Sequence, residues 1–102
     1  MANIVEARRA LVARILEREG RASPALRRAA FDNTGLAEPL ATLVERVAKR
    51  ANAVSDQDIA ATRAAGLNED HIFELVVCAA VGQAMRQHEK ALAALDVAAA
   101  KV

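Results

Sequence analysis

The feature that most constrains this chain is a helical pattern that runs from Glu69 to about Leu95 without a proline and with a single glycine, Gly82. Asn68 stands before the pattern as an N-cap residue. Glu69 and Asp70 occupy the first turn, where the helix dipole favours acidic side chains. We therefore expect a C-terminal helix that is the longest element of the fold.

Apolar residues at helical spacing, together with start and stop signals, predict four further helices. Ser23 before Pro24 is an N-cap followed by proline at the first helical position. Ser55 with Asp58 has the form of a capping box, and Gly66 suits a left-handed C-cap. The expected helices cover residues 4–19, residues 24–31, about fourteen residues from near Glu38–Pro39, and residues 56–65. Asn3 and Glu6 have the form of a capping box at the start of the first of these helices.

Alanine contributes 26 residues to a hydrophobic set that makes up 54% of the chain, and only 29 larger apolar residues remain. Buried apolar surface contributes about 25 cal/mol per Å², so an alanine adds much less than a leucine or a valine. The core is therefore thin, and we expect the chain to gain burial by self-association. Small residues on two predicted helices would allow close packing between chains: Ala60, Ala61, Ala64, Ala65, Ala79, Ala80, Gly82 and Ala84.

The composition also excludes several classes of protein. No run of about 18 apolar residues could span a membrane, and one cysteine cannot build a disulfide scaffold. Abundant Ala, Leu, Arg and Glu, with few β-branched and aromatic residues, argue against disorder and against a β fold. We predict a single all-α domain over residues 1–102, a bundle of about five helices, with N-terminal helices in residues 1–35 and a helical core in residues 36–97.

Targeting signals and charge say little about partners. Residues 1–6 enter an amphipathic helical pattern without an apolar stretch, so we expect no secretory signal and a cytoplasmic protein. Residues 1–50 carry a net charge of +4, from ten Lys/Arg and six Asp/Glu, and residues 51–102 carry −3, from four and seven. Such an imbalance is typical of solvated helix faces, and the alternative is charge complementarity between subunits or with a partner.

Three side chains are weak catalytic candidates: His71, Glu74 and Cys78, which share one helix face at positions i, i+3 and i+7. His71 and Cys78 would lie about 10 Å apart along the helix axis, too far for direct proton transfer. A site would need residues from another subunit. With no second cysteine a dithiol site is excluded, and Cys78 is expected to be a small buried hydrophobe.

Other kinds of site find no support in the sequence. His71 and His88 are 17 residues apart and no metal-ligand spacing occurs, so we expect neither a metal nor a cofactor. We expect both histidines to be exposed, and Asp56 and Asp58 to serve as helix-start residues. No glycine-rich phosphate loop is present.

Residues 58–77 match the outline of a DNA-binding helix-turn-helix, with a helix, a glycine turn and a second helix. The start of the second helix would face the DNA backbone, and it carries Glu69, Asp70, His71 and then Glu74. Acidic groups there repel phosphates, and a net charge of +1 offers no basic footprint. Nucleic-acid binding is therefore a low-ranked alternative.

The segment from Val54 to Leu92 contains an ordered set of motifs: Ser55–Asp58, the Arg-Ala-Ala-Gly-Leu turn of residues 63–67, Asn68–Asp70 and Ile72–Glu74. With the preceding helix it resembles the carboxymuconolactone decarboxylase and alkyl hydroperoxidase D-like family over residues 38–95. The resemblance implies an all-α fold that assembles into obligate oligomers, often trimers or hexamers.

The peroxidases of that family use a Cys-x-x-Cys pair with a histidine and an upstream glutamate, and its decarboxylases act on a small lactone acid. Residues 1–54 contain neither Cys nor His, so the redox motif is missing and Cys78 is not a catalytic thiol of this type. We expect a non-redox oligomer that serves as an assembly or interaction subunit, with itself or a related protein, or that binds a small apolar ligand. The alternatives are an enzyme of the same family whose site is completed between subunits, with Glu74 and His71, and the helix-turn-helix regulator.

Overall fold

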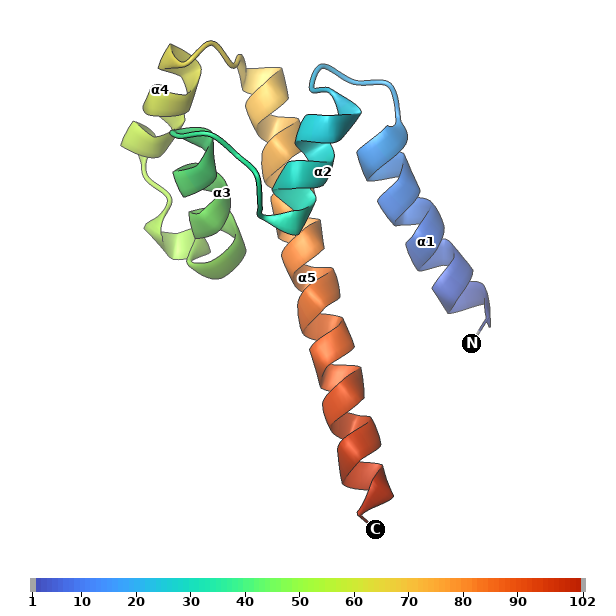
Figure 1. The fold of residues 1–102 in the computed structure, drawn as a ribbon. Helices are drawn as coiled ribbons and strands as arrows, with labels where there is room; N and C mark the ends of the chain where they lie inside the picture. The colour runs from blue at the N-terminus through green and yellow to red at the C-terminus, as the bar shows by residue number, and fades with distance from the viewer. Residues whose placement is uncertain (1, 102) are drawn as a thin grey trace.

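The computed structural model describes residues 2–101, and within that range every regular element is helical (Figure 1). The prediction of an all-α fold with five α-helices and a long C-terminal helix is confirmed. The elements are α1 (Ala2–Glu17), α2 (Pro24–Asp32), α3 (Leu40–Lys49), a short 3₁₀ turn η1 (Ala51–Ala53), α4 (Asp56–Ala64) and α5 (Glu69–Ala100).

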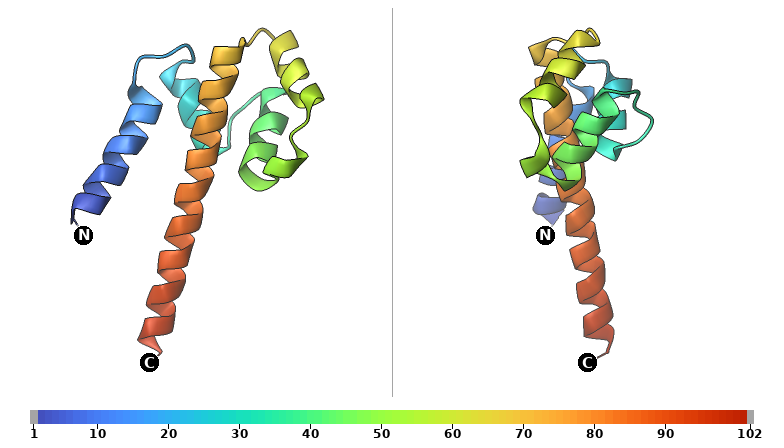
Figure 2. Two further views of the ribbon diagram at one scale, coloured as in Figure 1. Left: turned by 180° about the vertical axis from the view of Figure 1, so that it is seen from behind. Right: turned by 90° about the vertical axis from the view of Figure 1, so that its left-hand side faces the viewer.

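Helix α5 is the axis of the molecule. Helices α2 and α3 pack against its first half, α1 stands on one side of it and α4 on the other, beside α3 (Figures 1 and 2). The second half of α5 projects beyond the other helices, and the chain measures 54 × 29 × 20 Å. The N-terminal end of α1 points in the same direction as this projection.

The hydrophobic core is small and lies where α2, α3 and the first half of α5 meet. Leucine and valine from α3 face the apolar side of α5, and alanines fill the space beside α2. The buried hydrophobic residues are Leu16, Ala22, Ala30, Leu40, Leu43, Val44, Ile72, Leu75, Cys78 and Ala79. The alanines predicted on α4 are all exposed in the single chain, so only Ala79 and Gly82 of the small-residue set are buried within it.

Three of the four start signals identified in the sequence form as predicted, at Ser23, Ser55 and Asn68. The Ser23 hydroxyl accepts a hydrogen bond from the Leu26 backbone N–H at 3.1 Å, and Asn68 Oδ1 accepts one from His71 N–H at 3.0 Å. Ser55 and Asp58 make the reciprocal capping box of α4. Short polar side chains fix these helix starts because they satisfy backbone donors that the helix itself leaves free.

Three helices have bounds that differ from the sequence predictions by two residues or more. Helix α1 already begins at Ala2 and ends at Glu17 rather than at residue 19, so Asn3 lies within the helix and is not its N-cap, and the capping box expected there was wrong. Helix α3 is shorter than fourteen residues: it starts at Leu40, where Glu38 Oε1 accepts the Thr42 N–H at 3.0 Å, and it gives way to η1. Helix α5 continues to Ala100 rather than Leu95, because its alanine-rich end contains no residue that stops a helix.

Gly82 sets how closely α2 can approach α5. A Cβ atom at this position would collide with the backbone carbonyl of Phe31, at the C-terminal end of α2. Arg86, one turn later on α5, donates from Nη1 to the same carbonyl oxygen at 2.5 Å. Gly82 therefore lets the backbones of α2 and α5 come close, and Arg86 holds them together at the same carbonyl group.

Gly82→Ala should lower the free energy of unfolding by about 1–3 kcal/mol, because the methyl group forces α2 away from α5. In an unobstructed helix the same change would raise stability by about 1 kcal/mol, so the sign of the effect reports the contact. Ala84→Gly is the matched control, since Ala84 is exposed on the same helix and should lose only helix propensity. Urea unfolding followed by circular dichroism measures both, and a stabilised Gly82→Ala variant would contradict the close approach.

Candidate functional site

The three candidate residues do lie along one side of α5, but each has a different partner. Among the described residues, no hydrogen bond joins any two of them. The His71 ring Nδ1 lies 2.8 Å from Asn68 Oδ1, and the Glu74 carboxylate faces the loop between α1 and α2. Cys78 lies beneath α1, with Sγ 3.8 Å from the Ile15 carbonyl oxygen. The single chain therefore contains no Cys-His-Glu constellation.

Glu74 holds the α1–α2 loop against α5. Its Oε1 accepts the Arg21 backbone N–H at 2.9 Å, and its Oε2 accepts the Ala22 N–H at 2.7 Å. Gly20 permits this approach, because a Cβ atom there would meet the carboxylate. Burial alone would raise the pKa of Glu74, but the two backbone donors, with the charges of Arg27 and His71, outweigh it and lower the pKa. A carboxylate held in this way is a structural acceptor and is poorly suited to act as a base.

Cys78 is the buried hydrophobe that its neighbours in the sequence predicted, with 1% of its surface exposed. Burial raises the pKa of the Cys78 thiol, and the nearby charge of Arg27 only partly offsets this. Because the thiolate is the reactive form, such a cysteine is a weak nucleophile.

The histidines differ from one another. His88 is exposed, as expected, on the part of α5 that lies beyond the other helices. His71 is half-buried at the start of α5, where full exposure was expected, because its ring turns back onto the Asn68 side chain that caps the helix.

Sequence reasoning missed Arg27, the functional candidate with the least ordinary environment. Its side chain is only 4% exposed, and its Nη1 donates to the Ile15 carbonyl oxygen at 3.1 Å. Its Nε is buried and has no acceptor among the described residues. The spacing of Arg27 in the sequence could have indicated its burial, because Arg27 lies three residues before the buried Ala30 and so shares the inner face of α2.

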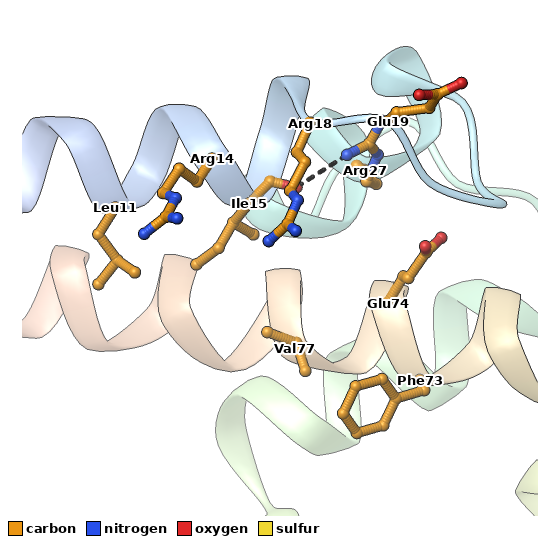
Figure 3. A pocket seen from close by; sticks show the side chains of 9 residues that line it. All are labelled: Leu11, Arg14, Ile15, Arg18, Glu19, Arg27, Phe73, Glu74 and Val77. Carbon is orange, nitrogen blue, oxygen red and sulfur yellow. Dashed lines mark hydrogen bonds between the residues drawn. The ribbon is translucent and has the colours of Figure 1, made fainter.

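Arg27 lines an open cavity of about 330 Å³ between α1 and α5, capped by the loop that Glu74 holds (Figure 3). The cavity wall combines apolar and charged side chains from both helices. They are Leu11, Arg14, Ile15, Arg18, Glu19, Arg27, Phe73, Glu74 and Val77.

The described residues give little support to three other kinds of site. In residues 2–101 no group of three or more His, Cys, Asp and Glu side chains could hold a metal ion. No described helix is long and apolar enough to cross a membrane. Helices α4 and α5 do form a helix–turn–helix outline, but exposed Glu69 and Asp70 lead α5, and Glu69 pairs with Arg63 at 3.4 Å. This acidic start disfavours contact with DNA phosphates.

Glu74→Gln should lower the free energy of unfolding by about 1–2 kcal/mol at pH 7, because the amide replaces a charged acceptor of two backbone donors. The pKa of Glu74 lies below its ordinary value of 4.5 in the folded chain, so its contribution is complete above that value and is lost as the pH falls through the folded pKa. The difference between wild type and variant, measured by urea unfolding from pH 7 to pH 3, should shrink accordingly. Glu19→Gln, an exposed carboxylate on the same cavity, is the control; an equal effect there, or a difference that grows in acid, would contradict the assignment.

Cys78→Ser should keep the fold and leave any activity unchanged, because the hydroxyl can still donate to the Ile15 carbonyl oxygen. In the native wild-type chain the thiol should react with a disulfide reagent more than about tenfold more slowly than in the urea-unfolded chain, since burial withholds the thiolate. Thiol labelling and a peroxide-turnover assay test this. A peroxide turnover that is present in the wild type and lost in the variant would overturn the non-redox interpretation.

No family model matches the chain, and neither a curated protein nor a solved structure matches it.

Proposed function

We propose that this chain is a non-redox, self-assembling helical protein of the carboxymuconolactone decarboxylase-like type, and that it works as an assembly subunit. The observation that carries the proposal is the end of α5, residues 87–100, which we name the stem. Every residue of the stem is exposed, although the stem is continuous helix (Figure 1). A helix of this length without tertiary contacts is marginal in water, so the stem calls for a partner.

The stem carries an apolar side. Leu92 and Leu95 are 44% and 65% exposed and lie three residues apart, so they share one face of the helix. Val81 and Met85 are half-buried on the same face further up α5, next to the helices of the body. The apolar face of α5 thus continues past the point where the chain's own helices stop covering it.

The surface area of the chain supports the same conclusion. The chain exposes 7059 Å². A compact monomer of 10.8 kDa exposes about 5,500 Å² by the usual scaling of surface with mass. The excess of about 1,500 Å² exceeds the roughly 800 Å² that each partner buries in a stable protein–protein interface. There is therefore enough unburied surface for an interface of ordinary size.

A second copy of this chain is the partner that fits these observations. The N-terminal half of α1 leaves Ile4 and Val5 exposed, and α1 extends toward the same end of the molecule as the stem (Figure 2). Two apolar helical surfaces at one end of a molecule allow an isologous contact, in which each copy offers both surfaces to the other. Association of two copies through these surfaces would bury more apolar area than the thin core of one chain provides.

The enzymatic alternative would require a second copy to complete a site beside His71 and Glu74. The Glu74 carboxylate already accepts two backbone hydrogen bonds, and Cys78 is enclosed under α1. These contacts favour an assembly role over catalysis.

Leu92→Glu with Leu95→Glu should reduce the assembly to a monomer of 10.8 kDa, because four charges would have to be buried in a dimer interface. Light scattering after size-exclusion chromatography measures the mass, and wild type should show an integral multiple of it. Helicity and the α2–α5 core should persist, because neither residue contacts the core.

Val97→Glu is the matched control, since Val97 is 57% exposed and lies on the opposite side of the stem. It should leave the mass unchanged. A wild-type chain that is monomeric, with a melting temperature that does not depend on concentration, would overturn the proposal.

A further inference from the structure

We propose that the cavity between α1 and α5 binds a small monocarboxylate with a hydrocarbon tail, and that Arg27 holds its carboxylate. This site goes beyond the assembly role and stands on a different observation, a buried and incompletely paired guanidinium in a cavity wall (Figure 3).

Arg27 has hydrogen-bonding capacity that the protein leaves unused. A guanidinium has five N–H donors, and among the described residues the Ile15 carbonyl is the only acceptor within hydrogen-bonding distance of this one. Nε is enclosed by the protein, whereas Nη2 is not enclosed in this way and has no acceptor among the described residues, so Nη2 is the donor that a ligand oxygen in the cavity can reach. A guanidinium with unpaired donors is unfavourable when buried, so an occupant that supplies an anionic oxygen is favoured at this position.

The charged side chains of the cavity wall favour an anion. Arg14, Arg18 and Arg27 line the cavity against two carboxylates, Glu19 and Glu74. Both oxygens of Glu74 already accept backbone hydrogen bonds from the α1–α2 loop, and Glu19 is exposed to solvent. The wall thus has a formal charge of +1, which a single anionic group balances.

The rest of the cavity wall is largely apolar. Leu11 and Ile15 on α1 face Val77 on α5, and Phe73, which is 70% exposed, lies at the rim (Figure 3). These side chains offer apolar surface to a tail whose head is held by Arg27. At about 330 Å³ the cavity is at the lower end of the range for small-molecule sites, so the ligand is small.

Octanoate is the probe for this site, and octan-1-ol is the matched neutral ligand. Isothermal titration calorimetry on the full chain should show saturable binding of octanoate, one per chain, and at least about tenfold weaker binding of octanol, because the alcohol carries no charge to pair with the guanidinium. Equal binding of the two ligands would show a purely apolar cavity and overturn the proposal. Binding of sulfate as tight as that of octanoate would overturn the role of the tail.

Variants locate the site. Arg18→Gln and Arg14→Gln, both exposed on the cavity rim, should each weaken octanoate binding several-fold, and Arg27→Gln should weaken it by about tenfold or more if circular dichroism shows that it folds. Arg9→Gln removes the same charge from α1 outside this cavity and should have no effect. An equal loss in Arg9→Gln, or no saturable binding to the folded wild type, would overturn the proposal. The Leu92→Glu/Leu95→Glu variant should still bind octanoate, so a failure of self-association and a failure of this site give different results.

Discussion

The contact between α2 and α5 is the interaction on which the rest of the structure depends. It forms because Gly82 leaves room for the Phe31 carbonyl and because Arg86 donates to that carbonyl. Buried Ala30 and Ala79 belong to the same thin core, and a chain with so many alanines can bury surface only where backbones come this close. The inner face of α2 is thereby buried, and Arg27 is buried with it.

The position of helix α1 depends on the α2–α5 contact indirectly. It meets the rest of the chain through a few apolar side chains, through the bond from Arg27 to Ile15, and through the loop that Glu74 holds. These attachments are all at its C-terminal half. The N-terminal half of α1 therefore leaves apolar side chains in solvent, and a cavity opens where α1 and α5 are not pressed together.

The local parts of this fold could be predicted from the sequence, and the long-range parts could not. Ser23, Ser55 and Asn68 each accept a hydrogen bond from a backbone N–H three residues away, so their neighbours in the sequence suffice to identify them. Glu74 acts on backbone groups 52 and 53 residues away, and no local pattern distinguishes it from a solvated glutamate. Arg27 was missed for a related reason, because a pair of arginines on a short helix is typical of an exposed face, and only the packing of α2 shows that one of them is buried.

The stem and the cavity are two consequences of the same shortage of large apolar residues. In a chain with more large apolar residues, α1 would pack closely on α5, which would close the cavity and bury Leu11. Further apolar side chains could then also cover Leu92 and Leu95. Helix α1 contributes to both surfaces, with Ile4 and Val5 toward the stem and Leu11 and Ile15 at the cavity. A ligand that holds α1 against α5 at the cavity would also hold the N-terminal half of α1 in place for self-association. By thermodynamic linkage, self-association would raise the affinity of the cavity for its ligand by the same factor. The two proposed binding events are therefore expected to be coupled through α1, while each rests on its own residues.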